Sequence, residues 1–188
     1  GNKPIDQRSS YGLGEVLKAA LDNQAEHIVM SLGGIGSFDA GAGMLQALGA
    51  KFYDDEANIV DVSDGAYKIK YIRRIDLSNV HPRLADAKLQ LMSDFSSRLY
   101  GKQSEIMQTY QTFHLNQNEA AEIDNLVWYF SELFKSELKL AIGPIERGGA
   151  GGGIAAVLKG LYQAEILTSH ELVNQITHLE DLIEQADL

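Results

Sequence analysis

The sequence contains no cysteine among its 188 residues, and this absence removes several classes of function at once. Disulfides, zinc sites built from thiolates and a cysteine nucleophile all need that side chain. Long apolar runs are also missing, since no stretch approaches the roughly 18–20 residues that cross a bilayer. Residues 1–10 are polar and lack the apolar segment of a signal peptide. We therefore expect a cytoplasmic protein with no membrane partner.

Basic residues are scarce, since 16 lysines and arginines stand against 26 aspartates and glutamates, a net charge of −10. This balance argues against non-specific nucleic-acid binding, which depends on basic side chains that neutralise phosphates. A phosphorylated small molecule stays compatible, because its site needs only a few local donors and backbone amides. The five histidines are scattered, and their spacing predicts no metal site.

The apolar residues make up 45% of the chain, which is enough for one packed α/β domain over residues 1–188. Helical periodicity covers residues 14–24, and the segment HIVMSL at 27–32 is typical of a strand buried on both faces. A glycine turn follows this strand, and a second helical pattern covers residues 40–50. This order predicts an α/β fold, a layered sheet with flanking helices.

The second half of the chain is predicted to be rich in helix. Residues 72–85 resemble a connector, and KLQLM at 88–92 is predicted to be a strand that ends at a polar turn. Further helices are predicted over residues 103–112, 119–140 and 154–163, and from Ser169 through Leu179 and Leu182 to Ile183.

The turn from Gly33 to Gly41 is the first candidate site. Glycines between a strand and a helix leave backbone N–H groups free to face an anion, and ligands of open α/β sheets bind at this end of the strands. Ser37 adds a hydroxyl donor, whereas Asp39 fits a metal-facing carboxylate, a general base or a simple helix cap. The turn matches neither the Walker A pattern nor the Rossmann fingerprint.

Two further candidates lie later in the chain. The run GGAGGG at 148–153 brings backbone close enough to contact phosphate oxygens, with Arg147 beside it, or it is a flexible loop that allows close helix packing. Asp94 follows the predicted strand 88–92, where a carboxylate is either functional or a turn former.

Five segments, in this order, resemble the glycerate kinase family that is unrelated to P-loop kinases. The family's ATSYGTGEL, GGSATNDGGAGMLQALGA, RIDLSGLDPRL and GAGAAGGLGAAL each have a counterpart here, and the last segment resembles the run before its VITGEGRLD motif. The counterparts are SSYGLGEVLKAALD at 9–22, LGGIGSFDAGAGMLQALGAKF at 32–52, RRIDLSNVHPRLADAKLQLMSD at 73–94, GGAGGGIAAVLKGL at 148–161 and LEDLIEQADL at 179–188.

The resemblance implies an enzyme that transfers the γ-phosphate of ATP, with Mg²⁺, to a hydroxyl of D-glycerate. The family folds as two α/β domains around a cleft, and this chain corresponds to the central part, one domain of such a kinase. Asp39 is then expected to orient the hydroxyl or a Mg²⁺-bound water, with Asp94 across from it. The implied substrate and phosphate site is lined by Gly33, Gly34, Ser37, Gly41, Gly151, Gly152 and Gly153.

Several positions depart from the family's motifs. Ile35 to Phe38 replace its Ser-Ala-Thr-Asn, and Ser96, Ser97 and Arg98 replace Asp, Asn and Pro in its CDVDNP turn. Gln117 falls where the family has a lysine, and losing one such charged contact typically costs ~2.7–4 kcal/mol of transition-state stabilisation. The family's early DSFKGS motif and its GEGRLD motif are absent from this sequence, so half of the cleft is missing and we expect no kinase turnover from the isolated chain. The alternative is a non-catalytic module that binds a ligand or takes part in an assembly. We also expect a homo-oligomer, because apolar surface that is left uncovered favours self-association.

Overall fold

The main sheet of the molecule has three parallel strands in the order β1–β4–β5. In the computed structural model, which describes residues 3–178, 180 and 183, these are β1 (His27–Ser31), β4 (Lys88–Met92) and β5 (Glu165–Leu167). A second, antiparallel sheet pairs β2 (Lys51–Tyr53) with β3 (Arg74–Asp76). Parallel strands joined through helices confirm the predicted α/β fold.

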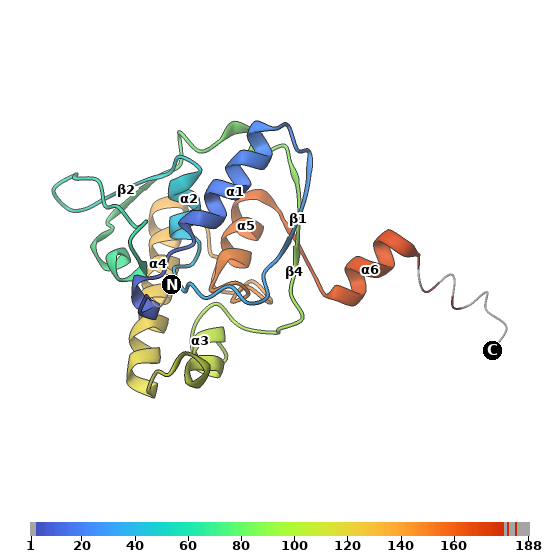
Figure 1. Ribbon diagram of the computed structural model, residues 1–188. Helices are drawn as coiled ribbons and strands as arrows, with labels where there is room; N and C mark the ends of the chain where they lie inside the picture. The colour runs from blue at the N-terminus through green and yellow to red at the C-terminus, as the bar shows by residue number, and fades with distance from the viewer. Residues whose placement is uncertain (1–2, 179, 181–182, 184–188) are drawn as a thin grey trace.

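Helices flank the main sheet, and Figure 1 shows α1, α2 and α5 on one side of it while α6 points away on the other. None of the helices in the described residues is long and apolar enough to cross a membrane. The α-helices are α1 (Tyr11–Asp22), α2 (Ala42–Ala47), α3 (Glu105–Thr109), α4 (Gln117–Leu138), α5 (Ile154–Tyr162) and α6 (Ser169–Thr177). Short 3₁₀ turns are η1 (Ile5–Gln7), η2 (Ala66–Tyr71), η3 (Pro82–Leu84) and η4 (Tyr110–Phe113).

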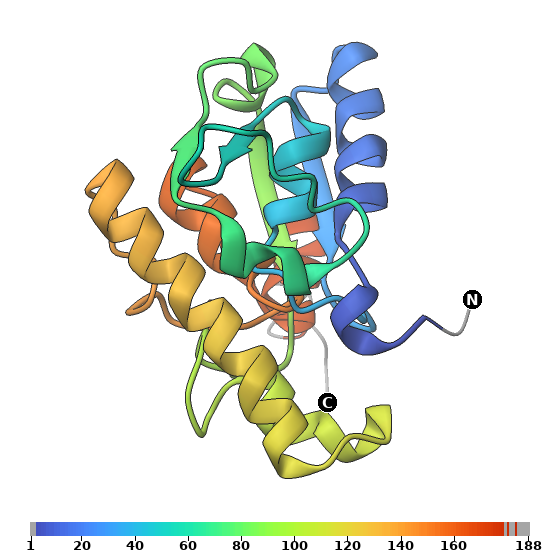
Figure 2. The same ribbon diagram turned by 90° about the vertical axis from the view of Figure 1, so that its left-hand side faces the viewer.

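The long helix α4 runs beside the second sheet (Figure 2) and packs against it. It begins at Gln117, and the N-cap residue before it, Asn116, forms a capping box with Glu119. Its buried face carries Phe130, which meets Phe52 of β2 and Phe134 edge to face with ring centroids 5.8 and 5.1 Å apart. Burying each of these rings contributes about 1.5–3 kcal/mol, so α4 is fixed mainly by its apolar face.

The prediction that residues 27–32 are buried on both faces is wrong. The side chain of Val29 is 48% exposed, because the described helices cover mainly one face of the sheet. The other face is polar at its centre, where the Gln90 side chain hydrogen-bonds His27 at 2.7 Å and Glu165 at 2.7 Å.

The other sequence predictions differ from the structure mostly at short elements. The predicted connector 72–85 contains β3 and η3, and the strands β2 and β5 were not predicted. Helix α2 is shorter than the predicted 40–50, since Gly41 and Gly49 take positive φ angles of 72° and 112° at its two ends. The described part of the last helix ends at Thr177, and Leu179 and Leu182 lie outside the described residues.

Candidate functional site

The turn 33–41 lies where β1 ends, as its sequence predicts. Pairing with β4 continues one residue beyond the strand, through a 2.9 Å bond from the Leu32 N–H to the Met92 carbonyl. Gly34 then takes a φ of +76° with no heavy atom within 4 Å of the position a Cβ would occupy. In the described part of the chain, no acceptor is hydrogen-bonded to the backbone N–H groups from Gly34 to Ser37. These amides are therefore available to a ligand.

A pocket of about 750 Å³ opens in front of this turn, and we call it the turn pocket. One wall is formed by residues 34–37, and the opposite wall by residues of the N-terminal segment that include Lys3 and Arg8. Ser9, Ser10 and Tyr11 also line it. The pocket thus combines unpaired amides with two cationic side chains, which is the chemistry that holds a small anion.

Arg8 is a candidate binding residue that sequence reasoning missed. Its Nε donates to the Lys3 carbonyl at 3.0 Å, and its Nη1 lies 3.5 Å from the Gly36 carbonyl. The guanidinium also sits 5.9 Å from the centroid of the Phe113 ring. The side chain is therefore held against the turn, although Arg8 is 28 residues away from Gly36 in sequence.

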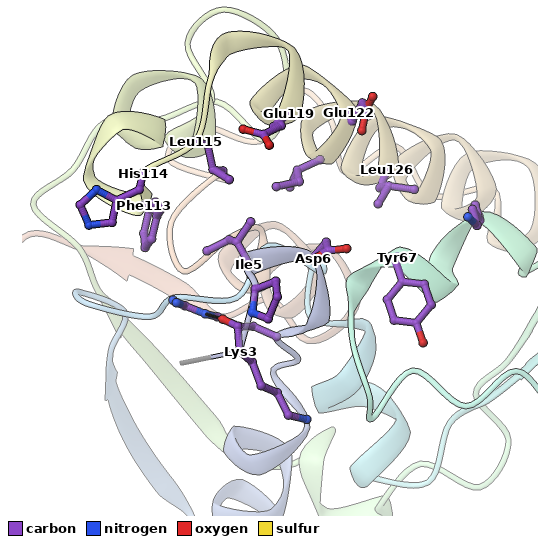
Figure 3. A pocket seen from close by; sticks show the side chains of 14 residues that line it. Lys3, Ile5, Asp6, Tyr67, Phe113, His114, Leu115, Glu119, Glu122 and Leu126 are labelled. Atoms are coloured by element: carbon purple, nitrogen blue, oxygen red, sulfur yellow. Dashed lines mark hydrogen bonds between the residues drawn. The ribbon is translucent and has the colours of Figure 1, made fainter. Parts of the chain in front are cut away.

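A second and larger pocket, of about 860 Å³, shares Lys3 and Arg8 with the turn pocket. In Figure 3 the helix α4 supplies Glu119, Glu122 and Leu126 to this α4 pocket, across from Lys3. Apolar side chains form much of the remaining wall, namely Ile5, Phe113, Leu115 and Ile123. The α4 pocket and the glycine-lined turn pocket thus meet at a pair of cations.

Asp39 lies behind the turn and is fully buried. Its Oδ2 accepts bonds from the Ser10 N–H at 2.8 Å, the Ser10 hydroxyl at 2.9 Å and the Gly43 N–H at 3.1 Å, while Oδ1 accepts from Gly41 at 3.1 Å. Burial raises the pKa of the carboxyl, and the bonds from Ser10 and the glycines oppose that rise. Asp39 is not the N-cap of α2, because that position is held by Gly41, but its carboxylate accepts the N–H groups of Gly41 and Gly43 where the helix begins. A catalytic role for Asp39 stays a prediction.

Close packing of α1 against α2 explains the glycines around Asp39. A Cβ on Gly43 would lie 2.1 Å from the Ser9 hydroxyl oxygen, and one on Gly14 would lie 2.5 Å from the Met44 carbonyl oxygen. Neither position has room for a side chain. The segments SSYGLG and DAGAG are therefore the two halves of one contact, in which two helices begin around a shared carboxylate.

The second glycine run packs directly against the first. Gly151, Gly152 and Gly153 all have positive φ angles, of 64°, 63° and 101°. The Ala40 N–H donates to the Gly152 carbonyl at 2.9 Å, and a Cβ on Gly152 would lie 1.9 Å from the Ser37 carbonyl oxygen. The structure thus brings the two predicted glycine segments together.

The carboxylate of Glu105 meets the amides of this second run. Its Oε2 accepts from the Gly152 N–H at 3.2 Å, and the Gly151 N–H also bonds to it. Burial raises the pKa of Glu105, against the lowering effect of these two amides. A contact between Gly151–Gly153 and a phosphate stays a prediction. In this structure the backbone amides of Gly151 and Gly152 are bonded to the Glu105 carboxylate instead.

Asp94 follows β4, as predicted, but it lines neither the turn pocket nor the α4 pocket. Its Oδ1 accepts from the backbone N–H of Ser169 at 2.7 Å and from the Ser169 hydroxyl at 2.9 Å. These bonds, with a smaller contribution from the charge of Arg147, lower the pKa of the exposed carboxyl. Asp94 therefore ties the end of β4 to the first turn of α6.

Two of the departures from the family motifs, Phe38 and Gln117, lie outside the lining of both pockets. Phe38 is buried and meets Phe113 edge to face, with ring centroids 5.4 Å apart. Gln117 is the exposed first residue of α4. Neither side chain lines the turn pocket or the α4 pocket. Within residues 3–178, 180 and 183, no three acidic or histidine side chains gather into a metal site.

These features define an α/β protein with a ligand-accessible turn at the carboxyl end of a parallel strand. The chain belongs to the glycerate kinase family, because the model of that family matches residues 2–188. It is 32% identical over 179 residues to glycerate kinase from Halalkalibacterium halodurans, and 30% identical over 180 residues to glycerate 2-kinase from Escherichia coli. Those matches cover 95% and 96% of this chain and 47% of each relative.

A solved structure agrees with this family. The crystal structure assigned to glycerate kinase 2 from Salmonella typhimurium LT2 matches with a TM-score of 0.88 and 29% sequence identity. The match covers 99% of this chain and 50% of that one. The chain therefore spans about half the length of the relatives that it matches.

Proposed function

We propose that this chain provides the anion-binding part of a site for ATP-dependent phosphorylation of D-glycerate. The observation that carries the proposal is the turn pocket, in which the unpaired amides of residues 34–37 face Lys3 and Arg8. D-Glycerate and the phosphates of ATP are both anionic. A family whose curated members are glycerate kinases makes these two the first ligands to consider.

In this proposal the chain contributes positioning and charge. The reaction breaks the bond between the γ-phosphorus of ATP and its bridging oxygen, and it forms a bond from that phosphorus to a hydroxyl oxygen of glycerate. Lys3 and Arg8, which line both pockets, offset negative charge on the ligands, and the backbone amides of the glycine turn donate to oxyanion oxygens. Mg²⁺ that arrives with ATP needs few protein ligands, because it keeps phosphate oxygens and waters.

The predicted site residues take different parts in this scheme. Gly34 and Ser37, which line the turn pocket, are proposed to contact the anion, and a contact from Gly33, which does not line it, stays a prediction. Asp39 acts as a positioning residue, since its buried carboxylate holds Ser10 and the start of α2 behind the turn. Gly41 and Gly151–Gly153 shape the turn by allowing close backbone contact.

Binding and turnover are tested separately. Because the chain spans about half of its relatives, we expect no ADP release above background with D-glycerate and MgATP in a coupled assay. Calorimetric titration with D-glycerate, phosphoglycerate and ATP should still detect binding of at least one of them. Arg8→Gln is expected to weaken that binding about tenfold or more, as the loss of a charge-assisted contact does. Arg74→Gln, outside both pockets, is the matched control, and equal binding by Arg8→Gln and the unaltered chain would contradict the proposal.

A non-catalytic module is the second candidate, and the burial of Phe38 against Phe113 favours it. An aromatic side chain committed to the core replaces a polar residue of the family's turn, so selection at this position acts on packing. In this case none of the three ligands binds, and sedimentation at increasing concentration shows a stable dimer. The predicted single domain, the homo-oligomer and the cytoplasmic location stay predictions.

A further inference from the structure

A third pocket, of about 270 Å³, lies on the other side of the second glycine run. We call it the arginine pocket, because two of its six lining residues are Arg98 and Arg147. The others are Ser96, Ser97, Gln103 and Glu146. It shares no residue with the turn pocket or the α4 pocket. Any ligand of this pocket would therefore occupy a separate site.

Ser97 is the one buried residue in the lining of the arginine pocket. The residue is only 2% exposed, yet its hydroxyl oxygen has no hydrogen-bond partner. Its backbone is fixed, since the Ser97 carbonyl accepts from the Gly149 N–H at 3.2 Å. Leaving a buried hydroxyl unpaired costs about 1–3 kcal/mol, a cost that a bound acceptor would remove.

The two guanidinium groups supply positive charge and unused donors. Arg98 makes one long bond, from Nη1 to the Pro144 carbonyl at 3.4 Å, and no carboxylate of the described residues forms an ion pair with it. Arg147 pairs with Glu171 through Nη1 at 3.3 Å. A guanidinium carries five N–H donors, so both groups retain several for a ligand.

The backbone at Arg147 adds a smaller argument. Its φ is +56°, in the left-handed region that glycine occupies without strain, and an arginine there costs about 1–2 kcal/mol. Arg98, for its part, stands where the motif of the family carries a proline. Both cations line the same pocket.

We propose that the arginine pocket binds the phosphate group of a small molecule, held between Arg98 and Arg147 with the Ser97 hydroxyl as a further donor. Planar guanidinium forks match tetrahedral oxyanions and bind them through paired N–H groups. Glu146 is the one acid in the lining, and Glu171, outside the lining, pairs with Arg147, so Arg98 is the cation that has no carboxylate partner among the described residues. A volume near 270 Å³ suits inorganic phosphate or a small phosphate ester better than a nucleotide.

The test titrates the purified chain with inorganic phosphate at constant ionic strength, with chloride as the balancing anion. Binding is followed by calorimetry and by the NMR signals of the arginine Nε–H groups. We expect the dissociation constant to rise at least tenfold in Arg98→Gln and in Arg147→Gln, and about threefold to tenfold in Ser97→Ala. Ser97→Ala should also unfold at the same or a higher urea concentration without phosphate, because it removes an unpaired hydroxyl.

Two control variants make the result decisive. Arg74→Gln removes a positive charge elsewhere, and an equal loss of affinity there would show general electrostatic attraction and overturn the site. Arg8→Gln removes a cation from the turn pocket. Phosphate binding that survives Arg98→Gln and disappears in Arg8→Gln would overturn this inference while supporting the proposed function. The opposite result supports the arginine pocket alone.

Discussion

The two glycine segments of this protein have similar composition and opposite surroundings. Around Gly34 in the first segment there is open space and a pocket, and the neighbouring amides are unpaired. Around Gly152 in the second segment, backbone of residues 37 and 38 fills the space where a side chain would stand. Both glycines have positive φ angles, so backbone conformation alone does not distinguish them.

The difference shows that a glycine run before a helix has two separate uses. In the first segment glycine exposes amides to solvent and to ligands. In the second it lets two stretches of backbone meet, with the Gly152 carbonyl bonded to Ala40 and the amides of Gly151 and Gly152 bonded to Glu105. The following predictions test this contrast, from the largest effect to the smallest.

Replacing one glycine of each segment by alanine should give the largest difference in stability between the two segments. Gly152→Ala places a Cβ 1.9 Å from the Ser37 carbonyl oxygen in a left-handed conformation, so we expect a loss of about 3–5 kcal/mol of unfolding free energy. Gly34→Ala has the same kind of backbone without the crowding, and about 1–2 kcal/mol is expected. Urea unfolding measures both, and equal losses would refute the contrast.

Removal of the carboxylate behind the first segment should have the next largest effect. Asp39→Ala leaves the N–H groups of Ser10, Gly41 and Gly43 without their acceptor, and we expect a loss of about 3 kcal/mol. Asp39→Asn keeps the shape and one acceptor oxygen, so its loss should be smaller, about 1–2 kcal/mol. Thermal and urea unfolding of the two variants compare them. A larger loss in Asp39→Asn would show that an amide N–H group facing these donors costs more than the missing acceptor, which would contradict the expected order.

The smallest effect concerns the carboxylate that meets the second segment. Burial raises the pKa of Glu105 above its ordinary 4.5, so the folded chain binds this proton more readily than the unfolded chain does. Its contribution to stability is complete below pH 4.5 and declines as the pH rises through the raised pKa. Glu105→Gln should therefore be more stable than the unaltered chain at neutral pH, by less than about 1 kcal/mol, and should lose that advantage in acid.

Asp94 is the matched control for that pH profile, because its pKa moves in the opposite direction. Bonds from Ser169 lower it below the ordinary 3.8, so its contribution is present above pH 3.8 and is lost as the pH falls through the lowered pKa. Asp94→Asn should therefore reduce stability at neutral pH and approach the unaltered chain in acid. Urea unfolding across this pH range compares the two variants, and profiles of the same sign would contradict the assignment of causes.

The elements that the sequence predicts well are the ones with a strong local signal. Strand β4 begins and ends where KLQLM does, and α4 follows its apolar face and the cap formed by Asn116 and Glu119. The three-residue strands β2, β3 and β5 carry too few residues for a periodic pattern, so they depend on partners distant in sequence. Burial of β1 was overestimated because an apolar composition does not reveal whether helices cover both faces of a sheet.

The candidate site could be predicted only in part. The position of the turn 33–41 at the end of β1 follows from local order, and so does Asp94 after β4. Arg8 escaped notice because only the folded chain brings it to Gly36. In the same way, the sequence holds no sign that Glu105 would reach the amides of Gly151 and Gly152.

The contacts of Asp39 and of Gly152 also differ in how soon a folding chain can make them. Ser10 and Asp39 are 29 residues apart, whereas Ala40 and Gly152 are separated by 112 (152 − 40). Closing the longer loop costs about 1 kcal/mol more in chain entropy. The contact between α1 and α2 around Asp39 should therefore form before residues 148–153 pack against the turn. The N-terminal unit of helix, strand and turn is then the early part of the fold, and residues 148–153 dock against the turn 33–41 later.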